Sequence, residues 1–509
     1  MPTAPRYRQP DLSWLAREGS PLPPGFLWGV ANAAFQVEGG YNGPGQPENN
    51  WAAWERSGKV EPAGAAVGFW DDFRRHLDLA VGMGLNAFRL SVDWTRLQPQ
   101  RGGGLDPDAL ARYVDMVVAC RARGLEPIVT LFHFTHPAWL GRDPWLDGSG
   151  PPAFEAFVSA VIPGLCRAMD ERGSAPPRWW ITVNEPNIFA FATYAFAAMP
   201  SGARPSPSRF RRALDQLLTA HVLAYRGVHR AYQDAGWPGP NVTYNTYCMT
   251  AYSLDRALMD LGQARAIGHR GGRARSFLDD RRQAFDADLR GLRGPAAAGS
   301  DRLLERLLLP APLDGLPSYV DALASGDGPG HDYTALDYYV GPLAHYLGVP
   351  FTGPWRRRRV PFVRELWETN IRPEGLRMFV MANSHPAMPV MVVENGMATW
   401  ARGSARRDRP DGWTRPAYIR AHVAELLEAA RRGANVAGYL HWTLVDNYEW
   451  GSYAPRFGLH GVDRSGEEPR ILETDASGRD AAGTYREIVE VLRSGDGGAA
   501  ARALLSPRP

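Results

Sequence analysis

Two glutamates each stand at the end of an apolar, β-branched run. Glu185 closes the run that begins at Trp179, and Glu394 closes the run that begins at Pro389. Pro186 removes a backbone donor directly after the first glutamate and ends regular strand pairing. Both runs are typical of buried strands that present one carboxylate at their C-terminal ends. Two carboxylates that flank one bond can hydrolyse a glycoside, one as a protonated acid and the other as an ionised nucleophile.

The elements that must position these glutamates alternate between strand and helix. Helical spacing of apolar residues predicts helices over 69–84, 110–123, 154–169 and 211–233. Polar residues gather where the predicted strands end, as expected at the catalytic end of a (β/α)8 barrel. We therefore predict an α/β fold, a single (β/α)8 TIM barrel. Its eight strands are expected within 25–40, 85–92, 126–134, 179–186, 241–247, 332–340, 389–394 and 435–442.

The expected domain organisation is one barrel with two tails. Residues 1–20 are predicted to form an N-terminal tail, and 21–493 the barrel. The Gly- and Ala-rich stretch 494–509 is predicted to be a flexible C-terminal tail. The strand and helix rhythm is lost over 249–316, between the fifth and sixth strands. This stretch is expected to be an insertion over the barrel mouth.

The composition narrows the class of protein. The chain has 509 residues, 44% of them hydrophobic, and a formal charge of +3, so it is neither disordered nor strongly basic. A nucleic-acid or membrane partner is therefore not expected. Lys59, the single lysine, lies in a predicted loop, which argues against Schiff-base chemistry. Three widely spaced cysteines and a polar N-terminus favour a reducing, cytoplasmic location. An oligomer remains possible.

Further residues at the predicted strand ends have the chemistry of a sugar site. Arg89 can hold a neighbouring carboxylate ionised. Other side chains offer hydrogen bonds to hydroxyls or flat apolar surfaces to a sugar ring: Gln36, His133, Asn184, Glu449, Trp442 and Trp450. No metal is predicted, because His133 and His136 are three apart on an extended segment and point to opposite faces. No phosphate loop or dinucleotide fingerprint is present, and no cofactor is expected.

Taken together, these residues resemble the β-glycosidases of glycoside hydrolase family 1. The resemblance runs from about Pro24 to Val491 and rests on the two glutamate motifs together with segments 35–39, 89–94 and 446–459. It implies Glu185 as general acid/base and Glu394 as nucleophile, with retention of anomeric configuration. It also implies that Gln36, His133, Asn184, Trp442, Glu449 and Trp450 hold the sugar, and that Tyr339 hydrogen-bonds the nucleophile.

The chain departs from the pattern of that family at three positions. Phe134 and Asp337 stand where the family usually has tryptophan and asparagine. An extra carboxylate at Asp337 is expected to raise the pKa of Glu394 unless Asp337 is itself paired or protonated. Thr369 occupies the position of a tryptophan that normally supports the leaving group. The Glu449–Trp450 pair resembles the pair found at this place in family members that act on unphosphorylated sugars.

These observations favour a retaining exo-β-glycosidase, with β-glucosidase as the expected specificity and a small-molecule β-glycoside or oligosaccharide as substrate. Two alternatives stay open. A transglycosidase would use an acceptor hydroxyl in place of water at the second step. A catalytically silent, sugar-binding barrel would use the same fold without chemistry, although such barrels typically lack one of the two glutamates.

Overall fold

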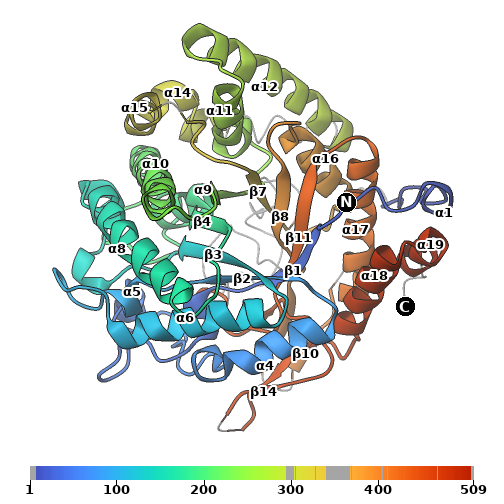
Figure 1. Cartoon of the computed structure of the whole chain (residues 1–509), viewed down its shortest axis with the longest axis horizontal. Coiled ribbons are helices and arrows are strands. Elements are labelled where there is room, and N and C mark those ends of the chain that lie inside the picture. Colours follow the sequence, from blue (N-terminus) through green and yellow to red (C-terminus); the bar gives the residue numbers. More distant parts are fainter. Residues whose placement is uncertain are drawn as a thin grey trace, which may run out of the picture.

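A ring of parallel strands occupies the centre of the molecule, surrounded by helices (Figure 1). The structure is a computed structural model that describes residues 7–505, apart from 294–302, 304, 327, 340–366, 368, 403–404, 410 and 467. The ring consists of β1 (Leu27–Ala31), β2 (Ala87–Ser91), β3 (Glu126–Phe132), β4 (Trp179–Val183), β5 (Asn241–Thr243), β6 (Asn245–Tyr247), β7 (Thr334–Tyr338), β8 (Val390–Asn395) and β11 (Val436–Trp442).

The ring closes as eight strand positions. The hydrogen-bonded order is β5-β4-β3-β2-β1-β11-β8-β7-β6. β5 and β6 are consecutive pieces of the predicted fifth strand, separated only by Tyr244, and they pair with β4 and β7 respectively. The predicted (β/α)8 barrel is confirmed, with the difference that its fifth strand is broken.

One helix of the outer layer follows each strand position. These helices are α4 (Phe69–Gly82), α6 (Pro107–Ala122), α8 (Gly150–Asp170), α10 (Pro207–Ala235), α11 (Arg256–Ala266), α16 (Pro373–Asn383), α17 (Arg415–Arg431) and α18 (Ala481–Ser494). Asp106, Ser206 and Thr414 cap the N-termini of α6, α10 and α17, and a proline stands in the first turn of each. Their apolar sides pack on strands whose side chains are almost wholly buried.

Shorter elements make the connections. The short helices are α2 (Ala34–Val37), α3 (Ala52–Arg56), α5 (Trp94–Leu97), η1 (Ala138–Leu140), α7 (Pro144–Asp147), α9 (Pro186–Ala190), η2 (Phe191–Ala195), η3 (Tyr252–Leu254) and α14 (Pro312–Gly315). Two small antiparallel sheets join β9 (Thr399–Arg402) with β10 (Ala405–Arg407) and β12 (Pro455–Arg456), and β13 (Val462–Asp463) with β14 (Arg470–Ile471). None of the described helices combines the length and the apolar composition that crossing a membrane requires.

The insertion lies between the fifth and sixth strand positions, as predicted, but its longest described helix does not cover the barrel mouth. α12 (Gly271–Arg293) lies at the outer edge of the molecule beside α11 (Figure 1). Arg281 on α12 donates to the carbonyl of Ala382 on α16 over 2.6 Å. The expected cover is therefore wrong for α12, which instead thickens the outer layer because it packs against α11 and α16. Beyond the predicted insertion, α15 (Pro317–Ala324) packs along α10.

The two ends of the chain pack together. α19 (Gly497–Leu505) contacts α1 (Leu15–Glu18) and α17, and Gln9 donates from Nε2 to the carbonyl of Leu504 over 2.9 Å. Leu12, Leu15 and Leu504 are buried. The prediction of a flexible tail is thus wrong over 497–505, because alanines that look featureless in sequence form one face of a packed helix.

Candidate active site

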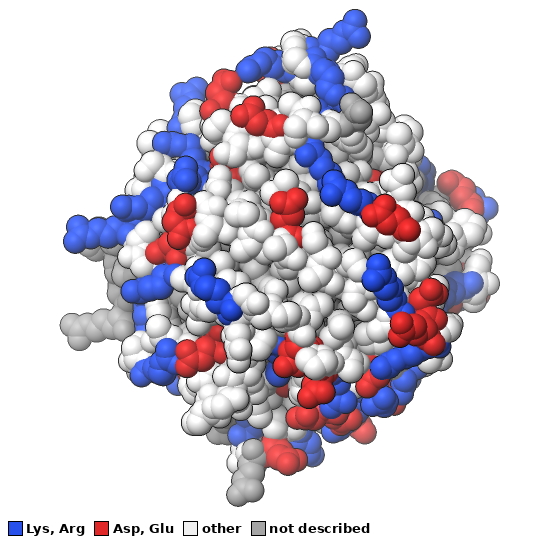
Figure 2. Space-filling model, turned by 60° about the vertical axis from the view of Figure 1, so that its left-hand side comes forward, with Lys and Arg blue, Asp and Glu red and all other residues white. Residues whose placement is uncertain are grey.

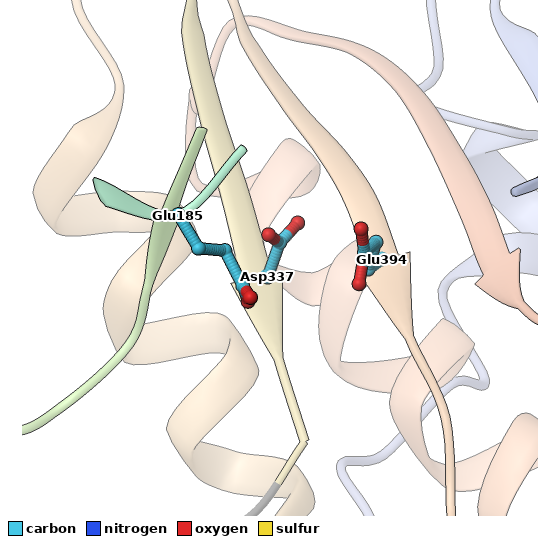
Figure 3. Close-up of side chains that lie close together, drawn as sticks. All are labelled: Glu185, Asp337 and Glu394. Carbon is cyan, nitrogen blue, oxygen red and sulfur yellow. The ribbon is translucent and has the colours of Figure 1, made fainter. Parts of the chain in front are cut away.

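Three carboxylates meet at the C-terminal ends of neighbouring strands. Glu185 follows β4, Asp337 stands near the end of β7, and Glu394 belongs to β8 (Figure 3). One oxygen from each lies within 4.8 Å of the other two. Their exposed fractions are 5%, 0% and 3%, so water screens their charges poorly. Such closeness is in the range of the carboxyl pairs that retaining glycosidases use.

Glu394 is held as an acceptor on both of its oxygens. Arg89 on β2 donates from Nη1 to Oε1 over 2.5 Å, and the hydroxyl of Tyr339 donates to Oε2. Burial raises the pKa of Glu394 above its ordinary value, and the Arg89 charge and the two hydrogen bonds limit that rise. Arg89 itself is fixed by Thr130, which accepts from Nε over 3.0 Å. These donors favour the ionised form of Glu394.

Glu185 has few donors around it. Asn184 Nδ2 approaches its Oε2 at 3.4 Å, and its Oε1 accepts no hydrogen bond from the described residues. Burial, followed by the charges of Asp337 and Glu394, raises the pKa of Glu185 well above its ordinary value. Glu185 also has a φ of 39°, in the left-handed region that non-glycine residues rarely adopt. Such strain is concentrated at functional sites.

Asp337 faces both glutamates. A register shift in the pairing of β7 with β8 brings Asp337 opposite Glu394. Its Oδ2 accepts from Asn245 Nδ2, while its Oδ1 has no partner among the described residues. Asn245 also donates to Asn184 over 2.7 Å and so joins the two strand ends. Asn245 was not predicted as a site residue. Its polar side chain near the end of the predicted fifth strand could have indicated that role.

The remaining predicted residues form a second cluster, which we call the amide–indole cluster: Gln36, His133, Trp442, Glu449 and Trp450. Gln36 Nε2 and Trp442 Nε1 each donate to Glu449 over 3.2 Å. The ring of His133 stacks on those of Trp442 and Trp450, with centroids 5.9 and 5.8 Å away.

Electrostatic interactions link this cluster to the carboxylates. Burial raises the pKa of Glu449, and the charge of Glu394 raises it further; burial lowers the pKa of His133, and the charge of Arg89 lowers it further. Two of its buried polar atoms, Gln36 Oε1 and His133 Nδ1, have no partner among the described residues. Buried polar groups are nearly always satisfied, so unpaired atoms beside the carboxylates suit a polar ligand. Asn447, whose Nδ2 is equally unpaired and whose Oδ1 accepts from Gln36, was predicted only as part of a motif.

Two of the residues that depart from the family pattern, Phe134 and Thr369, are buried in the structure. Phe134 is buried between Phe189 and Trp450. Thr369 is 1% exposed, with its carbonyl bound by Arg409. Its side chain therefore gives no flat surface to a leaving group. The preceding stretch, 340–366, lies outside the described residues.

Comparisons with known proteins agree with this architecture. The model of glycosyl hydrolase family 1 matches residues 19–260 and 356–490. Similar proteins include thermostable beta-glucosidase B of Thermobispora bispora, 29% identical over 93% of this chain and 92% of that protein. The bifunctional beta-D-glucosidase/beta-D-fucosidase of Bifidobacterium breve is 27% identical over 88% of this chain and 95% of that protein.

Among solved structures, the family 1 b-glucosidase of Thermotoga maritima in complex with isofagomine lactam has a TM-score of 0.66. It is 21% identical, and the match covers 92% of this chain and 99% of that one. The beta-glycosidase of Pyrococcus horikoshii has a TM-score of 0.63 at 23% identity, covering 94% and 96% of the two chains. With the family model matched over most of its length and the same barrel in these structures, the chain belongs to glycosyl hydrolase family 1 and is a glycoside hydrolase.

Proposed function

We propose that this chain is a retaining exo-β-glycosidase with β-glucosidase specificity. The observation that carries the proposal is the unequal environment of two adjacent carboxylates. Glu394 receives donors from Arg89 and Tyr339, whereas burial and neighbouring negative charge favour a proton on Glu185. Two carboxyl groups whose surroundings separate their pKa values are suited to nucleophile and acid roles.

The reaction follows from these two protonation states. An oxygen of Glu394 attacks the anomeric carbon while the glycosidic bond breaks, and Glu185 gives its proton to the departing oxygen. Esterification removes the charge of Glu394. Glu185, now ionised, takes a proton from water, whose oxygen attacks the anomeric carbon and releases Glu394. Two inversions at that carbon give overall retention.

The amide–indole cluster would bind the terminal sugar. Glu449 and Gln36 offer acceptors and donors to its hydroxyls, and the rings of Trp442 and Trp450 offer apolar surfaces to its C–H groups. The relatives in Thermobispora bispora and Bifidobacterium breve are named for activity on β-glucosides, the second also on β-fucosides. A small-molecule β-glucoside is therefore the proposed substrate.

We further propose a cytoplasmic location. Cys120, Cys166 and Cys248 are free and buried, as suits a reducing compartment. On the face in Figure 2, basic and acidic side chains are mixed with each other around a largely uncharged centre. That mixture differs from the continuous basic surface that nucleic-acid binding uses.

A panel of p-nitrophenyl β-glycosides tests the activity. The β-glucoside, β-galactoside, β-fucoside and β-mannoside are compared, and the anomer of the first sugar released is followed by NMR. Preference for the glucoside with a β-anomeric product is expected. An α-anomeric product would contradict retention, and no release from any sugar would contradict the function. Transfer to an added alcohol, outpacing release to water at low acceptor concentration, would identify a transglycosidase.

A further inference from the structure

The two-carboxylate mechanism leaves the third carboxylate, Asp337, without a role. Asp337 lies between 261 and 355, which the family model does not match. The side chain is completely buried, and Figure 3 shows it between Glu185 and Glu394. A buried carboxylate beside two others is costly unless something in the site compensates it. The compensating group must therefore be sought among its neighbours.

The hydrogen bonds around Asp337 leave one place for that group. Asn245 Nδ2 spends its two hydrogens on Asp337 Oδ2 and Asn184 Oδ1. Asp337 Oδ1 and Glu185 Oε1 are both buried and have no other partner among the described residues. An oxygen of Glu185 lies within 4.8 Å of an oxygen of Asp337. Two acceptor oxygens can share a site only if a proton or a cation lies between them.

A cation fits the cluster poorly. Both oxygens of Glu394 already accept hydrogen bonds, from Arg89 and Tyr339. The positive charge of the Arg89 guanidinium, which lies beside Glu394, would also repel a metal cation. Only two carboxylate oxygens remain for a metal, fewer than divalent ions commonly take from protein carboxylates in a buried site. A proton needs only these two.

We propose that Asp337 is a positioning residue that accepts the acid proton of Glu185 in a hydrogen bond, aims that proton, and holds it on Glu185 to higher pH. The inference rests on the proposed function of Glu185 as the acid. It assigns to Asp337 no contact with the reacting atoms. Its effect on catalysis is exerted through Glu185.

The charged groups facing Glu185 agree with a proton on Glu185. After burial, the charges of Asp337 and Glu394 raise the pKa of Glu185, and Arg89 lowers it. Burial and then the charge of Glu394 raise the pKa of Asp337 well above its ordinary value, whereas Arg89 and the hydrogen bond from Glu185 lower it. Tyr339 and the Cys248 thiol also face the site, and both stay neutral because burial raises their pKa values. With Asn245 donating to its other oxygen, Asp337 is placed as the acceptor of the shared proton.

The pair acts differently in the two steps of the reaction. In the first step the proton leaves Glu185 for the departing oxygen, while Glu394 loses its charge by forming the ester. Asp337 then faces an ionised Glu185 in place of an ionised Glu394, so the number of negative charges is unchanged. Repulsion from Asp337 makes Glu185 a stronger base toward water. The same residue therefore supports the acid and the base roles.

The test is the pH profile of kcat/KM for the isosteric variant Asp337→Asn on an alkyl β-glucoside, whose poor leaving group needs the acid. The pKa that sets the alkaline limb is expected to fall by about one unit. At pH values above that limb, kcat/KM should therefore be about tenfold lower than in the wild type. Asp93→Asn is the matched control, because Asp93 is equally buried but binds Thr95 and Thr135. Its alkaline limb should not move. An unmoved or raised limb in Asp337→Asn overturns the proposal.

A second variant separates positioning from general damage. In Glu185→Ala, assayed with a 2,4-dinitrophenyl β-glucoside and azide, adding Asp337→Asn should leave the pH profile unchanged because no acid remains. A shift that persists would show that Asp337 acts through another group. A wild-type enzyme that hydrolyses no β-glycoside contradicts the proposed function instead, so the two failures are distinguishable.

Infrared spectroscopy of the wild type keeps the proposal testable if Asp337→Asn does not fold. Because the buried Glu449 is also protonated near neutral pH, the readout is a difference spectrum between the wild type and each variant. A carboxylic acid carbonyl band should be lost on going from the wild type to Glu185→Gln and kept on going to Glu394→Gln. No loss of a band in Glu185→Gln would overturn the assignment of the proton to Glu185.

Discussion

The guanidinium of Arg89 lies 2.5 Å from Glu394, and neither side chain is more than 4% exposed. A buried pair of this kind stabilises the ionised carboxylate while costing desolvation energy of its own. Because Arg89 lowers the pKa of Glu394 against the effect of burial, its loss should raise that pKa. Loss of Arg89 should therefore change two quantities, the free energy of unfolding and the pH at which kcat/KM falls on the acidic side.

Arg89→Met should move the acidic limb of kcat/KM to higher pH by about one unit or more. It should also destabilise the protein by about 3–5 kcal/mol, because an unpaired carboxylate remains buried. Arg89→Lys, which keeps the charge, is the control and should move the limb less. pH–rate profiles and denaturant unfolding measure the two effects. An equal shift in both variants would argue against a charge effect.

Glu394→Gly should lower kcat for β-glucosides by at least about 10⁴-fold, the scale of losing a covalent nucleophile. The space left beside Arg89 and Tyr339 can accept a small anion. Azide should then partly restore turnover and give an α-glycosyl azide, detected by NMR. Turnover equal to the wild type would remove Glu394 from the nucleophile role.

Glu185→Ala should separate substrates by leaving group. For poor leaving groups, loss of the acid should slow glycosylation by about 10²–10⁴-fold. A dinitrophenolate leaves without protonation, so the burst that reports its glycosylation should be nearly unchanged. Rapid-mixing kinetics on both substrates provide the measurement. Equal slowing of both bursts would contradict the acid assignment.

Glu449 predicts a pH dependence of stability in the absence of sugar. Burial raises the pKa of Glu449 from 4.5 to about 8. Between these values the folded protein binds a proton that the unfolded chain does not, so this group makes stability fall as pH rises. Glu449→Gln should flatten the decline of Tm from pH 5 to pH 8. A slope as steep as that of the wild type would contradict the shifted pKa.

The packing of α19 can be tested by two adjacent leucines. Leu504 is 1% exposed and Leu505 is 50% exposed. Leu504→Ala should cost about 2–3 kcal/mol of unfolding free energy through a buried cavity, whereas Leu505→Ala should be nearly neutral. Both variants should keep the kcat of the wild type, because neither is near the carboxylates. Equal stability of the two variants would show that α19 is not anchored.

Strand ends were predictable from sequence because their pattern is local. The runs ending at Glu185 and Glu394 carry the apolar signal, and a parallel barrel brings all such ends to one face. The break at Tyr244 was not predictable, since only its pairing with two different neighbours divides the strand. Likewise α19 lacks a strong sequence signal, because alanine is buried or exposed with equal ease.

The placement of Asp337 was predictable only in part. That Asp337 and Glu394 lie on neighbouring strands follows from the predicted strand order, but the position of Asp337 directly opposite Glu394 depends on register. Leu336 pairs with Val392 and Asp337 with Glu394, so Val393 is passed over. A shift of one residue changes which side chains share a face. Such irregularities arise from tertiary packing and leave no trace in a local pattern.

The contact between α1 and α19 has a consequence for biosynthesis. The hydrogen bond from Gln9 to Leu504 spans 495 positions, so this contact cannot form until Leu504 has left the ribosome. Until then the side of α1 that α19 contacts is uncovered on the nascent chain, as apolar surfaces of chaperone substrates are. Docking of α19 on α1 is therefore a late event in folding, and a ribosome stalled before α19 would hold a chain in which α1 lacks this neighbour.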